Sequence, residues 1–199
     1  MLLIGLTGSI GMGKSTTAKL FEQEGVACYD ADAAVHRLYQ KDGAGAAALK
    51  GVFPQAIVGG AVDREALAAI VLKDPQALAQ LESIIHPLLI GERQDFLQKN
   101  AEAGAFAVIL DIPLLFEKGD PADFDYVVTV SAPYEVQKQR VLARPNMTEE
   151  KFAAIYDKQL PDAEKTARAD FVVDTSVSVE DAHRQVKQII AKIKAETSH

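Results

Sequence analysis

The residues with the clearest chemical potential lie near the start of the chain, in the run Gly8-Ser9-Ile10-Gly11-Met12-Gly13-Lys14-Ser15. This run matches G-x-x-x-x-G-K-[ST], a pattern in which a glycine-rich loop binds the phosphates of a nucleoside triphosphate. Its glycines permit backbone torsions and close approaches that a side chain would block, so successive amide groups can point at an anion. An apolar stretch precedes the run and a helical pattern follows it, which favours a phosphate loop over a chance glycine-rich turn.

Each polar group of this loop has a predicted task. The Lys14 ammonium is expected to reach the β- and γ-phosphates, and the Ser15 hydroxyl to ligate Mg2+. The Thr16 hydroxyl is expected near the α-phosphate, where the positive end of the following helix also favours negative charge. The sequence therefore predicts Mg2+ as the cofactor and nucleotide contacts from Gly8, Ser9, Ile10, Gly11, Met12, Gly13, Lys14, Ser15 and Thr16.

Two carboxylates follow the second predicted strand, in Asp30-Ala31-Asp32. Ligands of open α/β sheets bind at the carboxyl edge of the strands, so these side chains are expected near the phosphates. A carboxylate there can accept the proton of an attacking hydroxyl or hold magnesium through water. In an extended chain the two side chains point opposite ways, and the alternative task is to cap the helix that begins near Ala33.

A further carboxylate, Asp111, ends the third predicted strand, which is the position of a magnesium-associated acid in many phosphate-loop proteins. The alternative is a strand-end residue that bonds local amides. The segment after it, Ile112-Pro113-Leu114-Leu115-Phe116-Glu117, is expected to border the site of the phosphoryl acceptor. His86 precedes Pro87 in a helical stretch, where a lone histidine is more often structural than catalytic.

Arg140 and Arg144 are four residues apart on a predicted helix and therefore share a face. On a mobile hairpin above the phosphates they would stabilise the charge that develops during phosphoryl transfer and help to exclude water. The alternative is a solvated helix face. The phosphate loop favours the first interpretation for Arg144 and leaves Arg140 open between the two.

The elements that must position these residues alternate between strands and helices. Short apolar runs rich in β-branched residues predict five buried strands, Leu2 to Leu6, Val26 to Tyr29, Phe106 to Leu110, Tyr126 to Val130 and Phe171 to Val173. Helical patterns cover Lys14 to Gln23, Glu135 to Ala143, Thr148 to Gln159 and about Val179 to Lys194. Alternation of this kind predicts an α/β fold with a five-stranded parallel sheet and flanking helices.

The stretch between the second and third strands is too long for one crossover. It has several helical segments and no convincing strand, which predicts a mostly helical insertion. One of its helices is expected over Arg64 to Leu72, and another from near Pro75, which Pro87 should bend or divide. The predicted division is a core of residues 1–34 and 106–199, with a lid at about 134–160, and an insertion of residues 35–105.

The composition is that of an ordinary globular protein. The chain of 199 residues is 48% hydrophobic and 25% charged, and no apolar run reaches the roughly 18 residues that would span a bilayer. Because the start lacks a basic region, we expect a cytoplasmic protein with no membrane partner. The net charge of −7 argues against nucleic acid, and no feature indicates an obligate protein partner. The single cysteine, Cys28, is expected to be a buried strand thiol.

With these residues in view, nearly the whole chain resembles the dephospho-coenzyme A kinases, a family in the nucleoside-monophosphate-kinase-like group of phosphate-loop proteins. The matching segments are Leu6 to Thr16, Asp30-Ala31-Asp32, Ile85-His86-Pro87, Ile112 to Glu117, Arg140 with Arg144, Gln159, and Ala169 to Asp174. The loop is common to many ATPases. The combination of Asp-Ala-Asp, His-Pro and Pro-Leu-Leu-Phe-Glu is much more specific.

The resemblance implies transfer of the γ-phosphoryl group of ATP to the ribose 3′-hydroxyl of dephospho-coenzyme A. It implies that Asp32 is the base, that Lys14, Arg140 and Arg144 assist the transfer, and that the helical insertion binds the acceptor. The implied acceptor contacts are Asp32, His86, Pro113, Leu114, Leu115 and Glu117, and the implied ATP contacts include Arg144 and residue 175. In many relatives an asparagine follows the last strand, and here Thr175 offers a hydroxyl that cannot reproduce the two contacts of an amide.

Two other functions compete with this interpretation. Another small-molecule kinase with a phosphate loop would share the loop, lid and magnesium but differ in its acceptor. A nucleotide-switched binding protein of the GTPase or regulatory ATPase type would be expected to carry an Asn-Lys-x-Asp element after a late strand, and the sequence has none.

Overall fold

A computed structural model of the chain describes residues 1–197. Two compact units form, one from Met1–Cys28 together with the chain from Gly104 onward, the other from Tyr29–Ala103. The second unit thus starts several residues before the predicted insertion. Within the described residues no helix is both long and apolar enough to cross a membrane.

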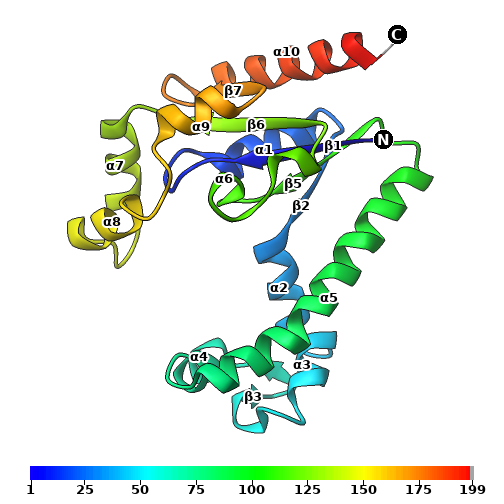
Figure 1. Ribbon diagram of the computed structural model, residues 1–199, viewed down its shortest axis with the longest axis vertical. Coiled ribbons are helices and arrows are strands. Elements are labelled where there is room, and N and C mark those ends of the chain that lie inside the picture. Colours follow the sequence, from blue (N-terminus) through cyan, green and yellow to red (C-terminus); the bar gives the residue numbers. More distant parts are fainter. Residues whose placement is uncertain (198–199) are drawn as a thin grey trace. The chain divides into compact units, whose positions relative to one another are not determined.

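The first unit is built on a five-stranded sheet in the order β2-β5-β1-β6-β7 (Figure 1). The strands are β1 (Leu2–Thr7), β2 (Ala27–Asp30), β5 (Ala107–Asp111), β6 (Tyr126–Ser131) and β7 (Phe171–Asp174), which confirms all five predicted strands. The central strand β1 pairs in parallel with β5 and β6, with Leu6 opposite Asp111 and Thr7 opposite Thr129. This register brings the ends of three strands together where the phosphate loop begins.

Helices cover both faces of the sheet because alternate strand residues point to opposite sides. On one face, Val128 and Val130 pack with α1 (Lys14–Gln23) and α10 (Val179–Thr197). The apolar spacing predicted for the last helix is confirmed, since Ala182, Val186, Ile189, Ile190 and Ile193 are all buried. On the other face, Val127 packs against α6 (Leu115–Lys118).

Three further helices and one short 3-10 turn complete this unit. The turn η2 spans Pro121–Asp123, and the helices are α7 (Tyr134–Leu142), α8 (Glu149–Tyr156) and α9 (Asp162–Arg168). The sequence patterns predicted α7 and α8 but not α9. The physical reason is that α9 has no apolar stripe, and the side chain that it buries is Lys165.

The second unit has its own core and is mostly helical. Its elements are α2 (Ala31–Tyr39), α3 (Ala44–Leu49), η1 (Pro54–Ala56), β3 (Ile57–Val58), β4 (Ala61–Val62), α4 (Arg64–Val71) and α5 (Pro75–Glu102). Leu49, Phe53 and Leu67 are at the centre of its apolar cluster. A two-stranded hairpin, β3 with β4, was not predicted, because each strand has only two residues joined at Gly59-Gly60.

The longest helix, α5, contains Pro87 and is not divided by it. Asp74 caps its start, where its carboxylate accepts hydrogen bonds from the amides of Gln76 at 2.8 Å and Ala77 at 3.3 Å. Proline removes one intrahelical hydrogen bond, and α5 bends along its length as a continuous ribbon (Figure 1). Packing of residues on both sides of Pro87, such as Ile85 and Leu88, accounts for the intact helix.

Candidate active site

The phosphate loop joins β1 to α1 through two glycines with left-handed backbone torsions. Gly11 has a φ of 79° and Gly13 a φ of 93°, values that side chains disfavour. A Cβ atom on Gly11 would lie 2.5 Å from Cγ2 of Val141, and one on Gly13 would lie 3.2 Å from Oγ1 of Thr175. Backbone conformation therefore favours glycine at both positions, and at Gly11 an added Cβ would also clash with Val141.

The backbone amides of the loop fall into two groups. The Ile10 amide donates to Oε1 of Gln159 at 3.1 Å, and the Met12 amide donates to the carbonyl oxygen of Ser9 at 3.2 Å. Within residues 1–197, no protein acceptor receives the amides of Gly11, Gly13, Lys14 and Ser15. These four amides, at the positive end of α1, remain available to an anion. The Met12 residue is 2% exposed and its side chain packs in the core. Met12 therefore contributes only its backbone groups to the loop.

Lys14 and Asp111 form an ion pair between the start of α1 and the end of β5. The Asp111 side chain is 6% exposed and that of Lys14 is 16% exposed, so both charges are largely removed from water. The carboxylate thus contacts the lysine of the loop, whichever local groups it also meets at the end of the strand. Ser15 and Thr16 are at the surface of the loop.

Two cavities flank the loop. One of about 460 Å³ is lined by the whole loop together with Pro113, Leu114 and Arg144. The other, of about 350 Å³, is lined by Gly11, Gly13, Arg140, Arg144 and the start of α10. Arg144 borders both and is exposed, and its guanidinium has no hydrogen-bond partner within residues 1–197.

Arg140 has a different environment from Arg144. Arg140 lies on α7, whereas Arg144 lies beyond the end of that helix at Leu142, so the predicted shared helix face is not found. Its guanidinium donates to the Thr175 hydroxyl at 2.9 Å and to the Thr175 carbonyl oxygen at 2.7 Å. The Thr175 hydroxyl in turn donates to the carbonyl oxygen of Met12 at 2.7 Å. The Thr175 residue is 8% exposed, so its hydroxyl is engaged by the protein.

The segment after Asp111 divides between the cavity and the core. Pro113 and Leu114 line the larger cavity, beside the phosphate loop. Leu115 is fully buried under the sheet. Glu117 also turns inward, where Oε1 accepts the Leu160 amide at 2.9 Å and lies 2.8 Å from Nζ of Lys165. The contacts of Leu115 and Glu117 are therefore internal.

The remaining candidates belong to the second unit. The Asp30 carboxylate caps α2 by accepting the Ala33 amide at 3.0 Å, so the capping alternative holds for this residue. Asp32 lies in the first turn of α2, is exposed, and its carboxylate accepts no hydrogen bond within residues 1–197. His86 is exposed on α5.

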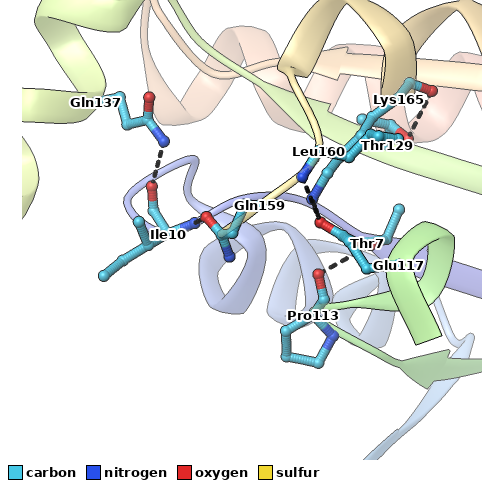
Figure 2. A network of polar contacts seen from close by, with 9 residues as sticks. All are labelled: Thr7, Ile10, Pro113, Glu117, Thr129, Gln137, Gln159, Leu160 and Lys165. Atoms are coloured by element: carbon cyan, nitrogen blue, oxygen red, sulfur yellow. Dashed lines mark hydrogen bonds and ion pairs between the residues drawn. The ribbon is translucent and has the colours of Figure 1, made fainter. Parts of the chain in front are cut away.

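Sequence reasoning missed Gln137, whose Nε2 donates to the Ile10 carbonyl oxygen at 2.8 Å (Figure 2). Gln137 is 1% exposed and lies four residues before the buried Val141. A polar residue on the buried face of a helix was the one available signal. Gln159 was among the matching residues of the resemblance but had no assigned task.

The α7–α8 hairpin (residues 134–160) carries both arginines and both glutamines. Its two helices are joined by contacts of Tyr134 with Phe152 and Tyr156, at ring separations of 5.9 and 5.3 Å. An exposed ion pair also links them, in which a hydrogen bond to Glu149 raises the pKa of Lys138.

The parallel sheet, the phosphate loop with its Lys14–Asp111 pair, and the arginine of the α7–α8 hairpin define a P-loop kinase. A shikimate kinase from Bacteroides thetaiotaomicron has the same fold, with a TM-score of 0.50 at 16% identity over 96% of this chain and 98% of that chain.

Comparisons of the sequence narrow this class. A family model described as dephospho-CoA kinase matches residues 2–181. A dephospho-CoA kinase from Nitrobacter winogradskyi is 53% identical over 96% of this chain and 95% of its own. One from Mesorhizobium japonicum is 52% identical over 98% of each chain. The solved dephospho-CoA kinase of Campylobacter jejuni has a TM-score of 0.68 and 26% identity over 96% of each chain. The chain belongs to the dephospho-CoA kinase family.

Proposed function

We propose that this enzyme transfers the γ-phosphoryl group of ATP to the ribose 3′-hydroxyl of dephospho-coenzyme A, giving coenzyme A and ADP. The bond from the 3′-oxygen to the γ-phosphorus forms while the bond from that phosphorus to the β,γ-bridging oxygen breaks. The observation that carries the proposal is the phosphate loop, with four unpaired amides and the Lys14–Asp111 pair, in a chain of this family.

The phosphate loop is proposed to hold the β- and γ-phosphates. The free amides of Gly11, Gly13, Lys14 and Ser15 supply hydrogen bonds that need no rearrangement. Lys14 is proposed to turn from Asp111 to the phosphates as the nucleotide binds, because a phosphate carries more negative charge than one carboxylate. The contacts of Ile10 and Met12, whose amides are bonded within the protein, are then indirect, through the shape of the loop. Gly8 and Ser9 stay proposed nucleotide contacts.

The donor set fits Mg2+, which favours oxygen ligands and is commonly bound through one or two protein groups together with phosphates and water. The Ser15 hydroxyl and the Asp111 carboxylate would hold the ion or its waters. When bound, Mg2+ neutralises charge on the phosphates. The residues of the chain orient the nucleotide around it.

Asp32 is proposed to accept the proton of the 3′-hydroxyl as that oxygen attacks. The capping role of Asp30 leaves Asp32 as the carboxylate of this pair without a backbone partner within residues 1–197. The unit Tyr29–Ala103, with His86, is proposed to bind the acceptor. Pro113 and Leu114 stay proposed acceptor contacts of the first unit. Leu115 and Glu117 are left out of this proposal because their contacts are internal.

The α7–α8 hairpin is proposed to act as the lid. Arg144, whose guanidinium borders both cavities without an internal partner, would stabilise the charge on the transferred group. Arg140 would act through Thr175 and the loop. Thr175 is then a support of the loop and not a reader of adenine. A cytoplasmic location and the lack of an obligate protein partner remain predictions.

The experiment is to incubate the protein with Mg-ATP and dephospho-coenzyme A and to detect coenzyme A by mass. A dephospho-coenzyme A analogue without the 3′-hydroxyl is the matched control, and it should give no product. Shikimate and nucleoside monophosphates test the competing kinase activities. Slow ATP hydrolysis that no acceptor accelerates would instead favour a nucleotide-switched protein and contradict the proposal.

A further inference from the structure

The apex of the phosphate loop is held from two sides by glutamine side chains of the α7–α8 hairpin (Figure 2). Gln159 accepts the Ile10 amide at 3.1 Å, and Gln137 donates to the Ile10 carbonyl oxygen at 2.8 Å. One residue of the loop therefore has both of its backbone groups bound by side chains that lie more than a hundred positions away in the sequence.

The backbone N–H and C=O groups of Ile10 fix the orientation of each glutamine carboxamide. An amide group of the backbone needs an acceptor, so Gln159 must present its oxygen, and a carbonyl group needs a donor, so Gln137 must present its nitrogen. Gln137 is 1% exposed, so water cannot readily replace this hydrogen bond. The two glutamines have opposite tasks and are not interchangeable.

The chain directly after Gln159 is anchored on the face of the sheet that packs against α6. The next residue, Leu160, donates its amide to Glu117, and Glu117 pairs with the fully buried Lys165. Glu117 lies on α6 and Lys165 on α9, so the end of the hairpin is tied to elements beside the loop. The hairpin between the two glutamines carries Arg140 and Arg144.

We propose that Gln137 and Gln159 are positioning residues that fix the phosphate loop at Ile10 and couple it to the arginines of the hairpin. We call these two hydrogen bonds the clamp. The next residue, Gly11, leaves the backbone free to rotate, and the clamp keeps the Ile10 peptide group from turning toward the phosphates. It therefore maintains the four free amides in their orientation. The inference rests on the proposed function, because its effect is on phosphate binding and transfer.

The test compares two isosteric substitutions, Gln137→Glu and Gln159→Glu. Each adds one negative charge against the same residue, Ile10. Only Gln159→Glu keeps an acceptor for the Ile10 amide, whereas Gln137→Glu replaces a donor by an acceptor. The kcat/KM for ATP should fall at least about tenfold further in Gln137→Glu than in Gln159→Glu, the scale on which misplacement of a binding group acts.

A pH profile distinguishes this positioning role from a general loss of structure. Protonation of the carboxyl group introduced by Gln137→Glu would restore a donor to the Ile10 carbonyl, so the activity of this variant relative to the parent should rise as the pH falls toward about 5. Gln159→Glu should change less over the same range, because its carboxyl group keeps an oxygen acceptor for the Ile10 amide in both protonation states. Equal losses in both variants with parallel pH profiles would overturn the clamp.

Gln137→Met and Gln159→Met keep the side-chain length without charge and serve if the buried carboxylate of Gln137→Glu prevents folding. Each should weaken Mg-ATP binding in calorimetry about tenfold, and unchanged binding in both would also overturn the inference. Lys138→Met, in the exposed ion pair of the same hairpin, is the matched control and should bind normally. A parent protein that binds Mg-ATP but makes no coenzyme A contradicts the proposed function alone, since calorimetry still tests the clamp.

Discussion

The hydroxyl of Thr175 donates a hydrogen bond to the carbonyl oxygen of Met12 at 2.7 Å while it accepts one from Arg140 at 2.9 Å. One buried oxygen thus joins the end of the last strand of the sheet, the phosphate loop and the α7–α8 hairpin. Gly13 packs against the same side chain, where an added Cβ would lie 3.2 Å from Oγ1. The loop is therefore supported at its second half by Thr175, as its apex is by the two glutamines.

Removing this hydroxyl should destabilise the protein. Thr175→Val keeps the shape of the side chain but leaves the Met12 carbonyl oxygen without that donor, which costs about 1–3 kcal/mol of unfolding free energy. Thr175→Ser retains the hydroxyl and should lose less. Urea unfolding of the two variants measures the difference. The preference for ATP over GTP should be the same in Thr175→Val as in the parent, and a changed preference would argue that the Thr175 hydroxyl reads the base.

Lys14, which pairs with Asp111, is expected to be essential for the binding and transfer of phosphate. Lys14→Ala should lower kcat/KM for ATP by roughly a hundredfold or more, because the charged phosphates lose their principal cation in a site with little water. Steady-state kinetics and calorimetry with Mg-ATP measure this. Unchanged kinetics in Lys14→Ala would remove the phosphate loop from the mechanism.

The phosphate loop could be predicted from the sequence, whereas the residues that contact it from distant parts of the chain could not. The loop is a local motif, and its function depends on the backbone of consecutive residues, so Gly8 to Ser15 was predicted. The five strands and the buried stripe of α10 were also predicted, because each has an apolar pattern of its own. Local patterns suffice for such elements.

Residues whose environment depends on distant partners could not be predicted. Glu117 turns inward because it meets Leu160 and Lys165, which lie more than 40 positions later. Lys165 in turn belongs to α9, a helix without an apolar stripe. Gln137 is a buried polar residue that contacts the loop across 127 positions. No periodicity in the sequence encodes such pairs.

Substitutions of Arg140 and Arg144 should differ in their effects on stability and catalysis. Arg140 is bonded to Thr175, so Arg140→Met should lower both the melting temperature and kcat. The Arg144 guanidinium has no hydrogen-bond partner within residues 1–197, so Arg144→Met should lower kcat about a hundredfold while the melting temperature stays unchanged. Thermal unfolding and turnover measured on the same samples decide this. A normal turnover in Arg144→Met would make the residue a solvated surface side chain without a catalytic role.

A contact between α1 and α10 predicts a pH dependence of stability. A hydrogen bond from His183 to Glu24 at 2.7 Å, with Lys187 nearby, lowers the pKa of Glu24 below 4.5. Because the folded pKa is the lower one, this contribution is present above the unfolded pKa and is lost as the pH falls through the folded value. Between about pH 5 and pH 3, the parent should therefore lose more stability than Glu24→Gln. If urea unfolding showed equal losses of unfolding free energy in the parent and in Glu24→Gln, the contact would have no role in the pH dependence of stability.

Asp30 and Asp32 form a matched pair for testing the catalytic base, since they are two residues apart at the start of α2. Asp30 caps the helix, and asparagine caps as well as aspartate, so Asp30→Asn should retain stability and most of the turnover. Asp32→Asn removes a carboxylate that bonds no backbone amide, and should cut kcat roughly a hundredfold with ATP affinity kept, the scale of a general base. Turnover with dephospho-coenzyme A and calorimetry with Mg-ATP measure the two effects separately. If Asp30→Asn lost the larger share of turnover, the base would be Asp30, and the cap at Ala33 would have to open during catalysis.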